Sequence, residues 1–183
     1  MKTKILKLAT ALSAAALAVS FSGPAAAAGS ATANLNVSAT VASGCSIATS
    51  PVAFGTYDPI VANATADINM AGNVQVTCVS GSTSVWVGLG QGNNYSAGRR
   101  MIGGTSGGFL AYHLYLPPTA VPAAACTYAG TEWGTTNGTD TLNPADTVWD
   151  GTTKTFNVCG VLTAGQVVPA DSYTDTVVAT VNF

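Results

Sequence analysis

Charged residues are scarce in this sequence of 183 residues: six are Lys or Arg, eight are Asp or Glu, and together they form 8% of the chain. Three of the six cations, Lys2, Lys4 and Lys7, stand at the N-terminus. The rest of the chain keeps three cations, too few to neutralise a run of phosphates or to hold an anionic membrane surface. The composition therefore argues against nucleic acid as a partner, and it shows no basic patch for a membrane surface.

Residues that carry catalysis or bind metals are equally rare. His113 is the only histidine, and it falls on the polar side of a run of alternating apolar residues, where a strand meets solvent. We expect no nucleophile elbow of the Gly-x-Ser-x-Gly type, and no Asp-x-Asp-x-Asp-Gly loop marks a calcium site. We expect no catalytic residue, no metal site and no cofactor, and therefore a protein that is not an enzyme.

Long apolar runs are absent except for one near the N-terminus. Residues 8–21 follow the three lysines, and a stretch rich in Ala comes next, with an Ala-x-Ala cleavage pattern that ends at Ala28. This order is typical of a secretory signal peptide. The run is also shorter than the roughly 20 apolar residues that a membrane span needs. We predict that residues 1–28 are removed, that the chain is exported, and that no segment spans a membrane.

Four cysteines follow the predicted signal peptide: Cys45, Cys78, Cys126 and Cys159. An even number in an exported chain indicates two disulfides. None has the Cys-x-x-Cys spacing of a zinc or thiol-exchange site. Three pairings are possible, and we favour Cys45 with Cys78 and Cys126 with Cys159, because each closes a local loop between strand-like segments. Each bridge should stabilise the fold by about 3–4 kcal/mol.

Apolar and polar residues alternate with a period of two, and no stretch after the signal peptide has the period of a helix. Gly or Pro interrupts nearly every longer stretch, which is typical of short strands joined by turns. Residues 90–108 and 117–144 are expected to be loops, and the first contains the cationic pair Arg99 and Arg100, for which we expect a solvated position. The sequence predicts an all-β sandwich in one domain, with strands within residues 33–41, 68–79, 85–89, 110–116, 156–161 and 173–183.

Several short motifs occur in an order that resembles a known family. They are Cys-x-Ile at 45–47, Phe-Gly-x-Tyr-Asp-Pro at 54–59, Val-x-Val-x-Cys at 74–78, Arg-x-Met at 99–101, Leu-x-Tyr-x-Leu-Tyr at 110–115, Trp-Gly at 133–134 and Val-x-Gly at 158–160. Gln166 and Pro169 follow, and the most specific motif ends the chain with Tyr173, Asp175, Thr176, Val177, Ala179, Val181 and Phe183. Over residues 45–183 the chain resembles the spore coat protein U domain family, which includes subunits of archaic chaperone–usher pili.

The resemblance implies an incomplete immunoglobulin-like sandwich that lacks its final strand. It implies a periplasmic chaperone that first lends a strand, an outer-membrane usher, and a fibre in which the N-terminal extension of the next subunit supplies the strand by β-strand addition. The chain would then consist of an extension, residues 29–44, and a pilin domain, residues 45–183. The donor strand would present the alternating apolar residues of the extension: Ala33, Leu35, Val37, Ala39 and Val41.

The predicted function is that of a structural subunit of a secreted surface fibre, which assembles with copies of itself or related pilins and supports adhesion and biofilm formation. Two alternatives stay open. One is a spore or cyst coat protein of the same fold. The other is a secreted carbohydrate-binding module, in which Trp86, Trp133 and Trp149 would stack on sugar rings. Trp86 stands between two valines, where packing in a core or an interface is the commoner role.

Overall fold

The structure is a computed structural model that describes residues 29–144 and 147–183. The predicted signal peptide, residues 1–28, lies outside the described residues. The chain divides into two units, Met1–Ala39 and Thr40–Phe183. The described part of the first unit, residues 29–39, contains no helix or strand.

The second unit is built from β-strands, and none of its described residues is helical. Within residues 29–144 and 147–183 no helix could cross a membrane. The prediction of an all-β fold is therefore confirmed. The strands are β1 (Cys45–Ser50), β2 (Ile68–Cys78), β3 (Trp86–Leu89), β4 (Arg100–Gly103), β5 (Phe109–Tyr115), β6 (Lys154–Leu162), β7 (Tyr173–Thr174) and β8 (Ala179–Asn182).

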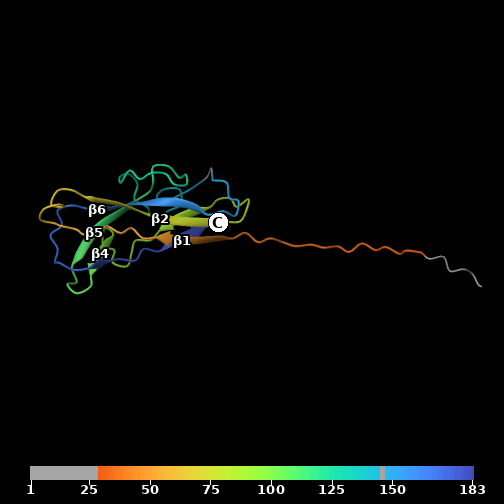
Figure 1. Cartoon of the computed structure of the whole chain (residues 1–183), viewed down its shortest axis with the longest axis horizontal. Helices are drawn as coiled ribbons and strands as arrows, with labels where there is room; N and C mark the ends of the chain where they lie inside the picture. Colours follow the sequence, from red (N-terminus) through yellow and green to blue (C-terminus); the bar gives the residue numbers. More distant parts are fainter. Residues whose placement is uncertain (1–28, 145–146) are drawn as a thin grey trace, which may run out of the picture. The chain divides into compact units, whose positions relative to one another are not determined.

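These strands form two sheets with antiparallel pairing throughout. The larger sheet has the order β1-β2-β6-β5-β4-β7, and the smaller one pairs β3 with β8. Strand β6 lies between β2 and β5 in the larger sheet (Figure 1). The core lies where the apolar faces of the two sheets meet. Fully buried side chains from both sheets fill it: Val74, Val76, Val87, Leu89, Leu110, Leu114, Phe156 and Leu162.

The alternation in the sequence accounts for β2, β3, β5 and β6 and fails elsewhere. No strand was expected at β1, and residues 33–41, where one was expected, form none. Strand β4 lies within residues 90–108, which the glycines had marked as a loop, and it pairs with both β5 and β7. With four residues, it is too short to show a period. The expected strand at 173–183 is divided into β7 and β8, because residues 175–178 leave the ladder and bond to the loop at 90–93 instead.

The cationic pair was expected to be solvated, and this prediction is wrong for Arg99. Its side chain is only 5% exposed. The guanidinium donates hydrogen bonds to the backbone carbonyls of Leu89, Gly90 and Trp133, so it joins the end of β3 to the segment after Glu132. Burial lowers the pKa of the Arg99 side chain. Carbonyl acceptors explain how a charge can be buried here, because each satisfies one of the fixed N–H donors.

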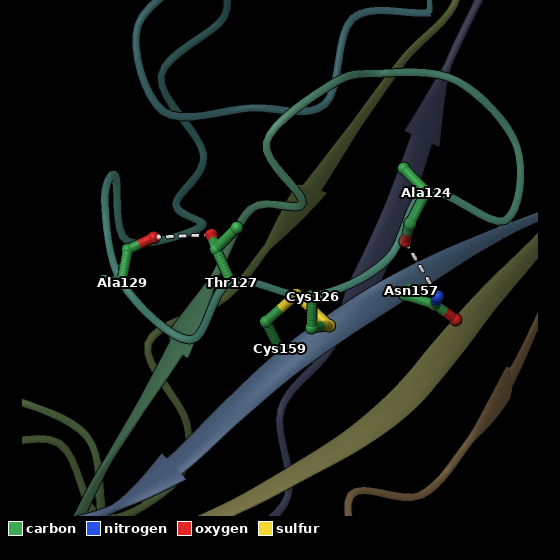
Figure 2. Close-up of a disulfide and its surroundings, with 6 residues drawn as sticks. All are labelled: Ala124, Cys126, Thr127, Ala129, Asn157 and Cys159. Atoms are coloured by element: carbon green, nitrogen blue, oxygen red, sulfur yellow. Dashed lines mark hydrogen bonds between the residues drawn. A yellow bond between two sulfur atoms is a disulfide. The ribbon is translucent and has the colours of Figure 1, made fainter.

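The two disulfides have the pairing that the sequence favoured. Cys45 is bonded to Cys78 across the β1–β2 pair, with a Cα–Cα distance of 4.1 Å. Cys126 is bonded to Cys159 of β6, with a Cα–Cα distance of 5.4 Å. Figure 2 shows that this second bridge holds a long loop against β6, and that the Asn157 amide donates to the Ala124 carbonyl beside it at 2.8 Å. Each bridge thus ties one segment to a central strand.

Candidate functional site: an open groove in the sandwich

The sandwich is incomplete between its N-terminal and C-terminal strands. β1 pairs with β2 through one edge, and β8 pairs with β3 through one edge. β1 and β8 lie close to each other, yet the described residues show no ladder between them. Because β1 and β8 are too close for a strand to fit between them, the open position lies beside them, between the segments at 49–59 and 168–179.

A groove runs along this gap, and we call it the open groove. It has two connected hollows with volumes of about 310 Å³ and about 610 Å³, which share Val52, Phe54 and Met101 in their lining. One wall is the segment at 49–59, and the other is the segment at 168–179. Core residues line it as well, among them Val74, Leu110, Tyr112, Leu114, Val158 and Leu162. The groove therefore opens directly onto the hydrophobic core.

The side chains of the two walls that face the core are less buried than the core side chains of β2. Within β2, which has neighbours on both edges, Val74 and Val76 are 1% and 0% exposed. The inward residues of the walls pack against the same core but remain partly exposed: Val52, Phe54, Tyr57, Tyr173, Val177 and Ala179. Apolar surface left half-covered on both sides of a groove favours an apolar occupant, because covering it removes it from water.

Backbone groups on both walls are also unpaired. Residues 51–57 form no backbone hydrogen bond with any described residue. On the opposite wall, the carbonyls of Thr176 and Val178 accept from Asn93 and Gly90. The backbone groups of Asp175 and Val177 make no such bond in the described chain. Because successive residues of an extended segment direct their backbone groups to opposite edges, those of Asp175 and Val177 face the groove. Unpaired edges of this kind are templates for an added strand.

Asp175 anchors the C-terminal wall. Its carboxylate accepts hydrogen bonds from the backbone N–H of Asn93 at 2.9 Å, the Asn94 amide at 3.1 Å and the Tyr112 hydroxyl at 2.7 Å. Burial, with the hydrogen bond to Asp175, raises the pKa of the Tyr112 phenol well above its ordinary value, so the hydroxyl stays protonated and donates. Gly92, with φ of 90°, leaves room for this carboxylate, since a Cβ there would lie 2.1 Å from an Asp175 oxygen, where no side chain fits.

Two further contacts hold the start of the same wall. The Tyr173 hydroxyl donates to the Pro169 carbonyl at 2.7 Å. The Asp171 carboxylate accepts from the backbone N–H groups of Thr105 and Ser106 at 2.8 Å and 2.6 Å. These amides lower the pKa of Asp171 to about 2. The C-terminal motif therefore combines apolar residues that face the groove with polar residues that fix the segment in place.

The N-terminal wall is fixed at one end through Tyr57 and Gln166. The Tyr57 hydroxyl donates to the Thr163 carbonyl at 3.1 Å and accepts from the Gln166 N–H at 2.8 Å. The Gln166 side chain in turn pairs with both backbone groups of Ala111 in β5, at 2.7 Å and 2.8 Å. Gln166 thus occupies the edge of β5 as a strand would. The motif residues Phe54, Tyr57 and Gln166 had no assigned role in the sequence, and their roles depend on contacts more than 50 residues apart.

The predicted donor residues belong to residues 29–44, for which the structure shows no strand. All five are exposed, and Leu35, Val37 and Val41 are 87%, 86% and 85% exposed. The alternation had suggested a half-buried strand. The described chain therefore contains both a groove that lacks a strand and an alternating apolar segment that lacks a partner strand. Whether the two meet is not tested by the structure and stays a prediction.

Comparisons with known proteins agree with this architecture. The profile of the family described as "Spore Coat Protein U domain" matches residues 31–180. The chain is 39% identical to "Protein U" of Myxococcus xanthus over 186 aligned positions, which cover 94% of this chain and 95% of that protein.

One solved structure has a similar fold. It is a pre-assembly complex between a chaperone and a tip adhesion subunit of the archaic chaperone–usher Csu pili of Acinetobacter baumannii. The match has a TM-score of 0.53 at 20% identity and covers 79% of this chain. This chain spans about two fifths of the length of the chain it matches there, 41%.

Proposed function

This chain belongs to the Spore Coat Protein U domain family, and we propose that it is a non-enzymatic subunit of a surface fibre assembled by donor-strand exchange. In this proposal the donor residues of one subunit fill the open groove of the next. The fibre passes through the periplasm to the cell surface, where it serves adhesion and biofilm formation. The observation that carries the proposal is the open groove, with unpaired backbone on both walls and core residues along it.

The donor segment fits the groove in length and pattern. Residues 33–41 correspond to about 26 Å of extended strand between the first and last residue. The walls at 49–59 and 168–179 contain slightly more residues than this segment, so it can lie along both. Ala33, Leu35, Val37, Ala39 and Val41 all point to one side of such a strand. In the groove this side would face the core, and the backbone would bond to the two walls, which is the chemistry of β-strand addition.

A subunit with an open core needs protection before it assembles, because exposed apolar edges aggregate. We therefore propose a periplasmic chaperone that occupies the groove during export, and an outer-membrane usher at which the donor segment replaces it. The similar fold of a subunit solved with its chaperone supports the first of these partners. In the fibre the subunit would contact copies of itself or related pilins.

A coat protein is the second candidate, and the description of the matching family favours it. The same groove and the same donor segment would then build a layer on a spore or cyst in place of a filament. Electron microscopy of the assembled material distinguishes the two, since a fibre gives filaments of constant width and a coat gives a continuous layer.

Removal of the donor segment tests donor-strand exchange, the step that the fibre and the coat would have in common. We expect a chain that lacks residues 29–40 to fold with both disulfides, to bind its chaperone and to accept a donor, but not to donate one. Gel filtration and electron microscopy should then find capped short oligomers in a mixture with the full mature chain, and no polymer from the shortened chain by itself. Unfolding of the shortened chain would show that residues 29–40 close the chain's own sandwich, and long polymers from it would refute the donor assignment.

A further inference from the structure

A second hollow lies away from the open groove, beside the start of β3, and we call it the β3 cleft. Its volume is about 710 Å³. No residue of its lining belongs to the open groove. It is lined by the residues at 80–86 and by Asn137, Asn143, Pro144, Thr147, Val148 and Trp149.

Trp86 lines this cleft and points away from the core. Its neighbours Val85 and Val87 are 6% and 0% exposed and face inward, so alternation places the Trp86 side chain on the outer face of the small sheet. Gly88 lies on the same face, and the indole Cζ3 is 3.4 Å from where a Cβ of that glycine would stand. The indole therefore reaches across a residue with no side chain, and Trp86 remains partly exposed.

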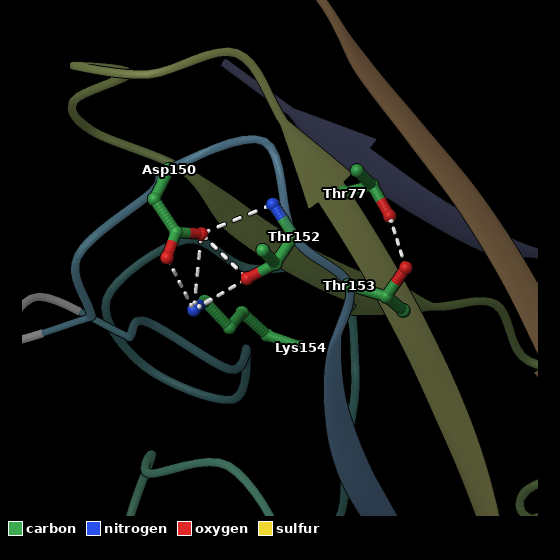
Figure 3. A network of polar contacts seen from close by, with 5 residues as sticks. All are labelled: Thr77, Asp150, Thr152, Thr153 and Lys154. Carbon is green, nitrogen blue, oxygen red and sulfur yellow. Dashed lines mark hydrogen bonds and ion pairs between the residues drawn. The ribbon is translucent and has the colours of Figure 1, made fainter.

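The surroundings of Trp86 are polar but uncharged. Across the strand pair, Asn182 stands opposite Trp86 and Thr180 opposite Gly88, on the same face. None of the described residues that line the cleft is charged. Asp150 follows Trp149 in the chain, but its carboxylate accepts from Thr152 and pairs with Lys154, as Figure 3 shows.

Several polar side chains of the cleft have no hydrogen-bond partner among the described residues. Ser80, Thr83, Ser84, Asn137 and Thr147 form no side-chain hydrogen bond with any residue that the structure describes. Hydroxyls and amides in this state can bond a ligand without first breaking an internal bond, which favours binding. A partly exposed indole among neutral donors and acceptors matches a ligand that has apolar faces, many hydroxyls and no charge.

We propose that the β3 cleft binds neutral polysaccharide, with Trp86 as the surface on which one sugar ring stacks. The flat C–H face of a pyranose ring would lie on the indole, and its hydroxyls would bond to the unpaired side chains around it. Trp133 and Trp149 are excluded from this role because they are 0% and 4% exposed, which corrects the expectation that all three tryptophans could stack on sugars. The site is separate from the open groove, so it is independent of the donor-strand proposal. Repetition of the site along an assembled polymer would multiply a weak affinity.

The tryptophan fluorescence of the chain can report on this site directly. The sequence has three tryptophans, of which Trp133 and Trp149 are buried. A ligand that covers Trp86 should therefore shift the emission to shorter wavelength and reduce quenching by acrylamide. Titrations of the purified exported chain with cellohexaose, laminarihexaose and chitohexaose should show this change for at least one of the three. A charged oligogalacturonate should not produce it.

Matched variants identify the residue. We expect Trp86→Ala to weaken binding of the responding oligosaccharide by about tenfold or more, measured by calorimetry. Trp86→Tyr should restore most of the affinity, because it restores an aromatic face. Tyr95→Ala is the control, since Tyr95 is 43% exposed and does not line the cleft, and it should bind as the unmodified chain does.

Three results would overturn the proposal. They are the absence of binding to all three neutral oligosaccharides, binding that Trp86→Ala leaves unchanged, and binding of the acidic oligomer in preference to the neutral ones. If none of the neutral oligosaccharides binds and Trp86 is protected from acrylamide in assembled material, the cleft is a contact between subunits.

Discussion

Two segments of this chain have the same alternating sequence pattern and different structures. Residues 33–41 alternate Ala, Leu and Val with Asn, Ser and Thr. Residues 173–183 alternate apolar residues with Thr and Asn, except at Asp175 and Val178. The first segment is exposed along its whole length and forms no strand. The second contributes β7 and β8 and turns its apolar side toward the core. An alternating sequence therefore makes a segment able to form a strand, but the strand forms only where another strand is present to pair with it.

The difference arises from polar anchors. Asp171 and Asp175 of the C-terminal segment accept hydrogen bonds from backbone groups at 93, 105 and 106 and from Tyr112. Residues 33–41 contain no Asp, Glu, Lys, Arg or Tyr that could make an equivalent contact. Residues 33–41 are therefore suited to pair with a strand edge of another molecule, whereas residues 173–183 are held against their own chain.

The largest effect should come from a charge in the donor segment. We expect Val37→Asp to give a soluble subunit with both disulfides and little or no polymer, because the carboxylate would enter an apolar groove at a cost of several kcal/mol. Polymer yield by sedimentation and electron microscopy measures this. Asn36→Asp is the matched control, since it adds the same charge to the opposite side of the strand and should still polymerise. Normal fibres from Val37→Asp would show that residues 33–41 are not the donor strand.

A charge in the groove should give the complementary defect. Val177 is a partly exposed residue of the C-terminal wall, and we expect Val177→Asp to leave a folded subunit that can donate but not accept. A mixture of Val37→Asp and Val177→Asp subunits should then form pairs and no polymer, because one donor and one groove remain intact. Mass photometry would count the species. Long polymers in this mixture would show that assembly does not use these two surfaces.

The polar anchor should have a moderate effect on stability. Asp175→Ala leaves the Asn94 amide and the Tyr112 hydroxyl without their acceptor, and it leaves the N–H of Asn93 with the Thr176 carbonyl alone. We therefore expect the free energy of unfolding to fall by about 1–3 kcal/mol. Tyr112→Phe removes one of the three bonds and should cost about 1 kcal/mol. Urea unfolding measures both. Hydrogen exchange should also show faster exchange of β8 in Asp175→Ala, and unchanged exchange there would contradict the anchoring role.

The smallest effect should be a dependence on acidity. Backbone amides lower the pKa of Asp171 from 3.8 to about 2, so the ionised carboxylate stabilises the folded chain above the pKa of the unfolded state. This contribution should be lost as the pH falls from about 4 to about 2. The difference in unfolding midpoint between the unmodified chain and Asp171→Asn should therefore shrink over this interval. A constant difference would show that the charge of Asp171 does not act through these amides.

The sequence was sufficient for the fold class and for most of the strands, because alternation and turn residues are local properties. β2 and β3 lie within the segments that their alternation marks, and β5 and β6 overlap theirs and extend beyond them. It was insufficient for β4, whose residues carry no pattern, and for Arg99, whose burial depends on carbonyls contributed by Leu89, Gly90 and Trp133. The sequence likewise did not show that Trp86 is partly exposed whereas Trp133 and Trp149 are buried.

The even number of cysteines and the period-two pattern could be taken from the sequence directly, since neither depends on which distant segments meet. The open groove was decided by the tertiary structure. It lies between the segments at 49–59 and 168–179, which come from opposite ends of the domain sequence and form no backbone hydrogen bond with each other among the described residues. Unpaired edges and half-covered side chains are relations between distant segments, and no single segment of the sequence contains them.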